Sequence, residues 1–369
     1  MTELGSPSPD RAAAPVPSAL ARGRAGALSA AYSGLVCDLD GVVYRGVDAV
    51  PGAPEVLRRL TAHGMAIVYA TNNASRLPSE VAEHLVSLGV PASAADVVTS
   101  AQAGAAELAA SFPRGSRVLA LGGPGVAAAL REVGLTAVPP EAADAGAPVA
   151  AVLQGLGRQL RVRDFETAAR HVTDGAVWVA TNTDATLPVE WGHAPGNGAY
   201  VALLAQATGR EPLVVGKPYA PLYQASVDRI GTRPEATLAV GDRLDTDIAG
   251  ALSAGLDAAW VLTGVHRPSD LVRQPELGPP TWVIGALTEL EQPYAAVLAS
   301  ADGFSCGGGY VQATQSGLEV AGGSATPVEL VRAGLAALLD RTARGLLEPE
   351  DAVRVAGELD AWLDGSPPQ

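Results

Sequence analysis

From residue 34 onward, short apolar runs alternate with stretches whose apolar positions recur at helical spacing. Several runs are apolar throughout, as expected for parallel strands covered on both faces. The pattern predicts strands at 35–38, 65–70, 97–99, 117–121, 149–153, 177–180, 237–240, 258–262 and 282–284. It predicts helices at 53–63, 78–88, 125–133, 165–172, 198–207 and 245–254. We therefore expect an α/β protein with a Rossmann-like, doubly wound parallel sheet.

Two regions interrupt this alternation. The Pro, Ala and Gly segment 138–148 indicates a loop, and residues 303–323 are rich in Gly, Ser, Thr and Gln. Amphipathic patterns at 327–344 and 349–363 then predict two final helices. These features predict a small, separate C-terminal α+β module.

Composition limits the classes of function. The 369 residues are 48% hydrophobic, so the chain can form more than one domain. Its net charge of -14 disfavours nucleic acid and anionic membranes as partners. No apolar stretch approaches the roughly 20 residues of a membrane span. Two cysteines cannot form a disulfide framework, and the first 26 residues lack a signal-peptide pattern, which favours the cytoplasm.

Acidic residues follow the first predicted strand. The run LVCDLDG places Asp38 and Asp40 two residues apart at its carboxyl end. Open α/β sheets bind ligands beyond the carboxyl ends of their strands. Two acids so close together repel each other unless a cation or a proton compensates. A turn with a helix cap is the structural alternative for such an acid pair taken alone.

Polar residues follow three further strands. Thr71, Asn72 and Asn73 supply a hydroxyl and two amides, which can orient phosphate oxygens. Lys217, in the string GKP, follows the short apolar run 213–215 and supplies one cation, although a lone GKP is also typical of a surface turn. The string GDRLDTDI, residues 241–248, supplies two more acids, one after the strand and one in the first turn of the next helix. The sequence thus predicts one site formed by four strand ends.

The strings DLDG, ATNN, GKP and GDRLDTDI, in this order, resemble the four motifs of the haloacid dehalogenase (HAD) superfamily of phosphatases. The strings ATNTDATLP (180–188) and PGNG (195–198) are similar to the subfamily named after NagD. That subfamily includes phosphoglycolate, pyridoxal phosphate, nitrophenyl phosphate and glycerol 3-phosphate phosphatases. The resemblance covers about residues 34–290. Each string alone is a weak signal, and the ordered set carries the resemblance.

The resemblance implies a role for each strand-end residue. Asp38 would be the nucleophile that forms an aspartyl phosphate. Asp40 would protonate the leaving alkoxide and later deprotonate water. The side chains of Asp38 and Asp242, with the backbone carbonyl of Asp40, would hold Mg²⁺. Lys217 would share the charge of the transferring phosphoryl group.

The remaining roles concern phosphate and orientation. Thr71, Asn72 and Asn73 would bind the phosphate. Asp247 would orient Lys217 or a water at the metal, although an acid in a first helical turn also favours the helix dipole without any catalytic duty.

The spacing of the motifs predicts how the chain is divided. About a hundred residues separate the second and third motifs, too many for one crossover. The resemblance implies that they form an inserted α/β cap of the C2 type, which would close over the site. We expect a disordered leader at 1–30, a core in two parts at 31–112 and 211–292, the cap at 113–210, and the C-terminal module at 293–369.

A cap of this kind favours a small phosphorylated metabolite as substrate. The cap strings are most similar to the glycerol 3-phosphate branch, with phosphoglycolate or pyridoxal phosphate as alternatives. Two further functions fit the same residues, namely a phosphomutase and, in a different class, a phospho-accepting sensory or binding protein. A homodimer through the cap is a further expectation.

The C-terminal module of some relatives is likened to the GNAT acetyltransferases. The segment Cys306-Gly307-Gly308-Gly309 lacks the leading polar residue and the spacing of an acyl-CoA loop. We therefore predict no acetyl transfer.

Overall fold

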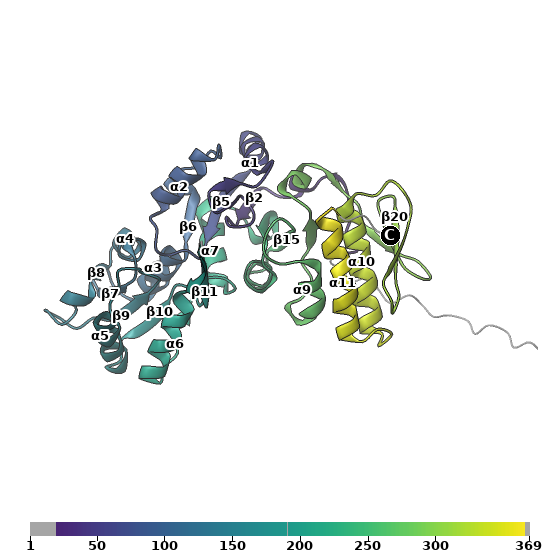
Figure 1. Ribbon diagram of the computed structural model, residues 1–369. Coiled ribbons are helices and arrows are strands. Elements are labelled where there is room, and N and C mark those ends of the chain that lie inside the picture. Colours follow the sequence, from purple (N-terminus) through teal and green to yellow (C-terminus); the bar gives the residue numbers. More distant parts are fainter. Residues whose placement is uncertain (1–19, 190, 366–369) are drawn as a thin grey trace, which may run out of the picture. The chain divides into compact units, whose positions relative to one another are not determined.

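A computed structural model describes residues 20–189 and 191–365 (Figure 1). These residues form two compact units. The larger unit consists of Leu28–Val265 and Ile284–Glu291. The smaller unit consists of His266–Val283 and the described parts of Met1–Ala27 and Gln292–Gln369.

A parallel sheet in the order β15-β14-β2-β5-β6 is the centre of the larger unit. Its strands are β2 (Gly34–Cys37), β5 (Ala66–Thr71), β6 (Val97–Thr99), β14 (Thr237–Gly241) and β15 (Asp257–Val261). At one edge the backbone N–H of Leu262 donates to the carbonyl of Ile284 at 2.9 Å, which extends the sheet; Ile284 ends β16 (Trp282–Ile284). All four residues of β2 are buried. Since β5 and β14 flank β2, the residues that follow these three strands emerge side by side.

The helices around this sheet are α1 (Ala53–Ala62), α2 (Pro78–Ser87), α3 (Ser100–Ser111), α7 (Ala220–Ile230) and α8 (Ala249–Ser253). The predictions of α1 and α2 are confirmed within one residue. The alanine-rich α3 is absent from the predicted helices because its sequence has little contrast between apolar and polar faces.

The predicted helix 245–254 is only partly correct. The structure has a π-helical turn, η5 (Leu244–Ile248), before the short α8. In this wider turn the carboxylate of Asp247 accepts a hydrogen bond from the backbone N–H of Arg243 at 3.1 Å. Turns of this kind occur often at functional sites.

Residues 117–214, which we call the inserted region, form a second parallel sheet between α3 and α7 of the chain. Its order is β13-β10-β9-β7-β8. The strands are β7 (Arg117–Leu121), β8 (Thr136–Val138), β9 (Ala151–Gln154), β10 (Val177–Ala180) and β13 (Leu213–Val214). The helices are α4 (Pro124–Glu132), α5 (Val162–Thr173) and α6 (Asn197–Thr208), and the hairpin is β11 (Thr186–Val189) with β12 (Gly192–Pro195).

The smaller unit holds a four-stranded antiparallel sheet and three helices. The sheet has the order β18-β19-β20-β21. Its elements are β18 (Val297–Ala299), β19 (Phe304–Cys306), β20 (Gly309–Ala313), β21 (Leu318–Ala321), α9 (Pro268–Arg273), α10 (Pro327–Ala343) and α11 (Pro349–Leu363). The predictions of α10 and α11 are confirmed within one residue.

The predicted leader and the domain boundaries differ from these units. Residues 20–30 are not a disordered leader, because β1 (Arg24–Ala27) pairs with β17 (Pro293–Tyr294) in the smaller unit. The rest of the predicted leader, 1–19, lies outside the described residues. Segment His266–Val283 groups with the C-terminal residues, although the sequence analysis counts it in the core. Periodicity cannot reveal such long-range pairing.

A buried arginine in the smaller unit gives a stability prediction. Arg332 is 3% exposed; its Nε donates to the carbonyl of Val283 at 2.7 Å, and its guanidinium lies 3.8 Å from the ring centre of Tyr294. We expect Arg332→Ala to destabilise this unit by about 2–4 kcal/mol, because a buried carbonyl loses its donor and a cation–π contact is lost. Calorimetric unfolding of the full chain measures the change in the free energy of unfolding. Exposed Arg354→Ala on α11 is the control, and equal effects of the two variants would contradict the prediction.

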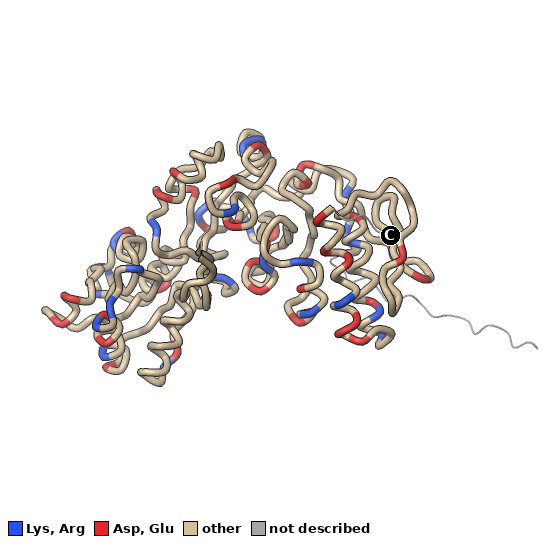
Figure 2. The backbone as a smooth tube through the Cα atoms, in the orientation of Figure 1, with Lys and Arg blue, Asp and Glu red and all other residues tan. Residues whose placement is uncertain are grey.

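Acidic and basic residues are interspersed along both units (Figure 2). Among the residues that the structure describes, no helix is long and apolar enough to cross a membrane.

Candidate active site

Three carboxylates meet beyond the carboxyl ends of β2 and β14. Asp38 follows β2, Asp242 follows β14, and Asp247 lies in η5. One oxygen of each lies within 4.8 Å of the others. Asp242 and Asp247 are 2% and 4% exposed. We call these three residues the carboxylate cluster.

Glycines leave the space that the cluster needs. A Cβ atom at Gly241 would lie 2.1 Å from the Cβ of Asp247, and one at Gly41 would lie 2.5 Å from Oδ2 of Asp242. Gly41 also has φ +80°, a conformation that other residues rarely adopt. These glycines of the DLDG and GDRLDTDI strings therefore allow the acids to approach each other.

Lys217 supplies the positive charge in contact with the cluster. Its Nζ donates to Oδ1 of Asp38 at 2.5 Å and to Oδ1 of Asp247 at 2.8 Å. The side chain is 3% exposed. Burial alone would lower the pKa of Lys217, but Asp247 and Asp38 outweigh it and raise that pKa well above its usual value. The ammonium group therefore stays charged.

The cluster as a whole is short of positive charge. Burial, with the nearby acids, raises the pKa of Asp38 well above its usual value although Lys217 opposes the shift. Burial, followed by the charge of Asp247, raises the pKa of Asp242 to about 7. Three carboxylates with one lysine thus form an oxygen-rich site that a hard divalent cation fits, because the cation would relieve their repulsion.

Asp40 lies apart from the cluster and is solvent-exposed. Desolvation by the surrounding protein raises the pKa of its carboxyl, and Arg76 and the backbone N–H of Gly46 oppose the shift. An accessible carboxyl with a raised pKa can exchange protons with a ligand at the strand ends.

Thr71, which ends β5, and the two asparagines that follow it divide into two groups. The hydroxyl of Thr71 accepts the backbone N–H of Asn73 at 3.1 Å, which leaves its hydrogen for another acceptor such as phosphate. The side chain of Asn73 accepts from the backbone and the hydroxyl of Ser75 at 3.0 and 2.7 Å. Asn72 instead contacts the main chain of Lys217 through its side-chain amide.

Two residues of the inserted region also reach Asn72. Nδ2 of Asn182 donates to its carbonyl at 2.7 Å, and the carboxylate of Asp184 accepts from its Nδ2 at 3.3 Å. Burial raises the pKa of Asp184, and Arg243 opposes the shift. From sequence, Asn182 and Asp184 fit a loop that contacts substrate and a structural cap or turn equally well. The ATNTDATLP string, which contains both residues, is the sequence signal that they lie near the site.

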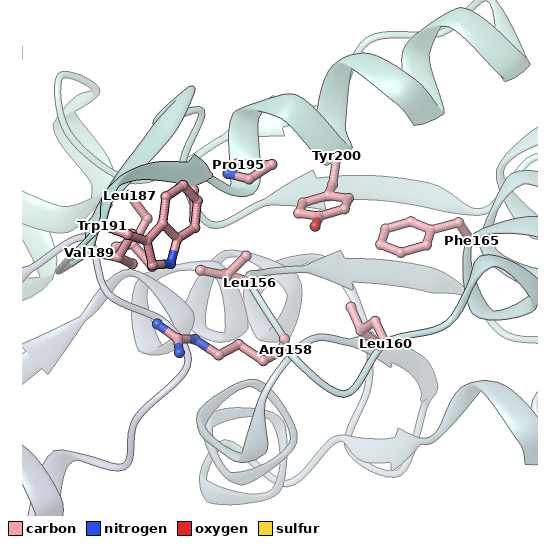
Figure 3. A pocket seen from close by; sticks show the side chains of 11 residues that line it. Leu156, Arg158, Leu160, Phe165, Leu187, Val189, Trp191, Pro195 and Tyr200 are labelled. Atoms are coloured by element: carbon pink, nitrogen blue, oxygen red, sulfur yellow. The ribbon is translucent and has the colours of Figure 1, made fainter.

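A hollow of about 280 Å³ lies within the inserted region (Figure 3). The stacked rings of Phe165 and Tyr200, 5.3 Å apart, form one end, and the exposed Trp191 lies at the other with Arg158. Trp191 belongs to the turn of the β11–β12 hairpin. The apolar and aromatic lining fits the non-polar part of an organic group, and the guanidinium of Arg158 could pair with an anionic substituent.

The fold and the site define an α/β enzyme with a carboxylate and lysine centre at the ends of parallel strands. A sequence profile of haloacid dehalogenase-like hydrolases matches residues 35–136, and a second HAD-like profile matches 214–290. The chain belongs to the haloacid dehalogenase-like hydrolases. This confirms the resemblance that the ordered motifs indicate.

The chain is similar to several phosphatases. It is 43% identical over 260 residues to a D-glycerol 3-phosphate phosphatase of Mycobacterium tuberculosis, covering 70% of each chain. A 5′-nucleotidase of Bacillus subtilis is 34% identical over 258 residues, which cover 70% of this chain and 97% of the relative.

The fold is also similar to solved structures of phosphatases. A glycerol phosphate phosphatase from Mycobacterium tuberculosis in complex with magnesium aligns with a TM-score of 0.74 at 38% identity, covering 84% of this chain and 91% of that chain. A p-nitrophenyl phosphatase from Archaeoglobus fulgidus aligns with a TM-score of 0.64 at 29% identity, covering 70% and 98%.

Proposed function

We propose that the protein is a Mg²⁺-dependent phosphatase that hydrolyses a small phosphate monoester through an aspartyl phosphate on Asp38. The observation that carries this proposal is the contact of Lys217 with Asp38 inside the carboxylate cluster. A phosphoryl group approaching Asp38 would meet the lysine that must stabilise its charge. The similarity to phosphatases supports the same reaction.

Two displacements make up the reaction. A carboxylate oxygen of Asp38 bonds to phosphorus while the bond from phosphorus to the alkoxide breaks, and Asp40 gives its proton to that alkoxide. Water then bonds to phosphorus, Asp40 takes a proton from it, and the bond from Asp38 to phosphorus breaks. The raised pKa of Asp40 supports its role as the acid. The free hydroxyl hydrogen of Thr71 would hold a phosphate oxygen.

The carboxylate cluster would hold the cation. The side chains of Asp38 and Asp242 and the backbone carbonyl of Asp40 are the proposed ligands, and Asp247 would orient Lys217, as their 2.8 Å contact supports. When bound, Mg²⁺ would supply positive charge to the phosphoryl oxygens.

The inserted region would act as the cap over this site. Asn182 and Asp184 support this role because they reach the strand-end residue Asn72. Among substrates, glycerol 3-phosphate comes first, because the relative with 43% identity is named for it. We also propose a cytoplasmic location and a homodimer that forms through the cap.

A substrate panel tests the proposed function. We expect phosphate release with Mg²⁺ from glycerol 3-phosphate at a higher kcat/KM than from phosphoglycolate, pyridoxal phosphate or a nucleoside 5′-monophosphate. Release from none of them would overturn the proposal. An isomerised product phosphate would instead indicate a phosphomutase, and stoichiometric phosphate uptake without turnover would indicate a phospho-accepting protein.

A further inference from the structure

Asn72 contacts both main-chain polar groups of Lys217. Its Oδ1 accepts the backbone N–H of Lys217 at 2.8 Å, and its Nδ2 donates to the backbone carbonyl of Lys217 at 3.2 Å. The two residues are 145 positions apart in the chain. The N–H and the carbonyl belong to the two peptide units on either side of the Lys217 Cα, so the paired bonds fix the main chain of this residue on both sides.

The side chain of Asn72 has no donor left for phosphate. An asparagine amide carries two N–H hydrogens, and phosphate oxygens only accept from it. One hydrogen goes to the carbonyl of Lys217, and the other goes to the carboxylate of Asp184 at 3.3 Å. A phosphate ligand would therefore have to break a bond that holds Lys217.

The inserted region also contacts the segment 215–217, which leads from β13 to Lys217. The strand β13 pairs with β10, and the N–H of Val215 donates to the carbonyl of Ala180 at 3.2 Å. Lys217 follows only two residues later. A Cβ atom at Gly216 would lie 2.3 Å from the carbonyl of Thr181 and 2.6 Å from Oδ1 of Asn72, so this segment fits closely between both.

Asn72 is itself anchored. Its carbonyl accepts from Nδ2 of Asn182 at 2.7 Å and from the hydroxyl of Ser100 at 2.7 Å. Asn182 and Ser100 are 5% and 0% exposed. Buried partners of this kind keep the main chain of Asn72 in one position, because leaving the donors unpaired is costly.

We infer that Asn72 is a positioning residue, which sets the main chain of Lys217 so that its ammonium group reaches Asp38. The inference rests on the proposed function and replaces the expected role of the Asn72 side chain as a phosphate ligand. Because β13 leads directly into Lys217, Asn72 also joins the lysine, the inserted region and the end of β5 in one hydrogen-bonded network.

A double-mutant cycle tests the inference. In the wild-type background we expect Asn72→Ala to lower kcat/KM for p-nitrophenyl phosphate by about 10²-fold, because a displaced charge loses most of its effect. In the Lys217→Ala background we expect Asn72→Ala to change kcat/KM by less than about threefold, since there is no ammonium group left to position.

Binding of inorganic phosphate supplies a second readout that needs no turnover. Calorimetry with Mg²⁺ should show weaker phosphate binding for Asn72→Ala in the wild-type background and no further weakening in the Lys217→Ala background. An undiminished effect of Asn72→Ala in that background, in either readout, would overturn the inference and identify Asn72 as a phosphate ligand. Full activity of Lys217→Ala itself would count against the proposed function instead.

Gln154→Ala is the matched control. Gln154 is a fully buried carboxamide of the inserted region whose Oε1 accepts from Nε1 of Trp178 at 3.0 Å. Its loss should lower the Tm, as the loss of a buried hydrogen bond does, with kcat/KM kept within about threefold. If both variants lose activity in proportion to their loss of Tm, Asn72 has only a structural role and the inference fails.

Discussion

Asp38→Asn is expected to lower phosphate release by at least about 10⁴-fold with every substrate, since an amide cannot form the covalent intermediate. The substitution keeps the volume of the side chain at the end of β2. We expect the fold to survive, because an uncharged group also relieves the crowding of acids around Lys217. A stopped assay with radiolabelled or malachite-green detection of phosphate measures the loss, and the Tm reports the fold.

The control for this variant is Asp48→Asn. Asp48 is an exposed residue of β4 (Asp48–Ala49), so the same chemical change there should leave kcat within about twofold. Turnover by Asp38→Asn close to that of the wild-type protein would refute the aspartyl phosphate mechanism. Acid quenching of the wild-type protein during turnover should also trap one labelled phosphate per chain.

Removal of Mg²⁺ is expected to reduce phosphate release to background. Without the cation the phosphoryl oxygens would meet the carboxylate cluster with only Lys217 to offset its charge. Treatment with EDTA followed by return of Mg²⁺ should restore the rate. We further expect Asp242→Asn to raise the Mg²⁺ concentration for half-maximal activity by at least about 10-fold, because it removes one charged ligand.

Asp245→Asn is the matched control for this second prediction. Asp245 lies in the same turn, but its carboxylate pairs with Arg243 at 2.9 Å and is not a member of the carboxylate cluster. The Mg²⁺ requirement of this variant should stay within about twofold of wild type. Equal Mg²⁺ curves for the two variants would show that Asp242 is not a ligand, and activity in EDTA would remove the metal from the mechanism.

The candidate site was predictable because its chemistry lies at strand ends. Buried parallel strands produce continuous apolar runs, and the residues after such runs must emerge at one edge of the sheet. Asp38 and Asp242 could therefore be assigned to one place from sequence order alone. Lys217 follows β13 of the second sheet, so its place beside them was implied only by the resemblance of the ordered motifs. The position of Asp247 depended on the π-helical turn, which helical periodicity does not reveal.

Other features of the fold could not be predicted from local sequence patterns. The helix α3 is nearly uniform in hydrophobicity, so its existence depends on what packs against it. The strand β1 has a partner near residue 293, and a pairing across the whole chain leaves no periodic signal. The four strands of the sheet in the smaller unit are absent from the predicted strands, because the glycine-rich composition of this segment indicates loops.

The sequence by itself determined the α/β class, the order of the strand-end motifs and the acids and lysine that they carry, because these follow from periodicity along the chain. Only the tertiary structure decided how the side chains share their hydrogen bonds. The side-chain amide of Asn72 could donate to a phosphate oxygen, yet its two N–H groups donate to Lys217 and Asp184. A donor can be assigned only when all of its neighbours are known, and those neighbours lie more than a hundred residues away.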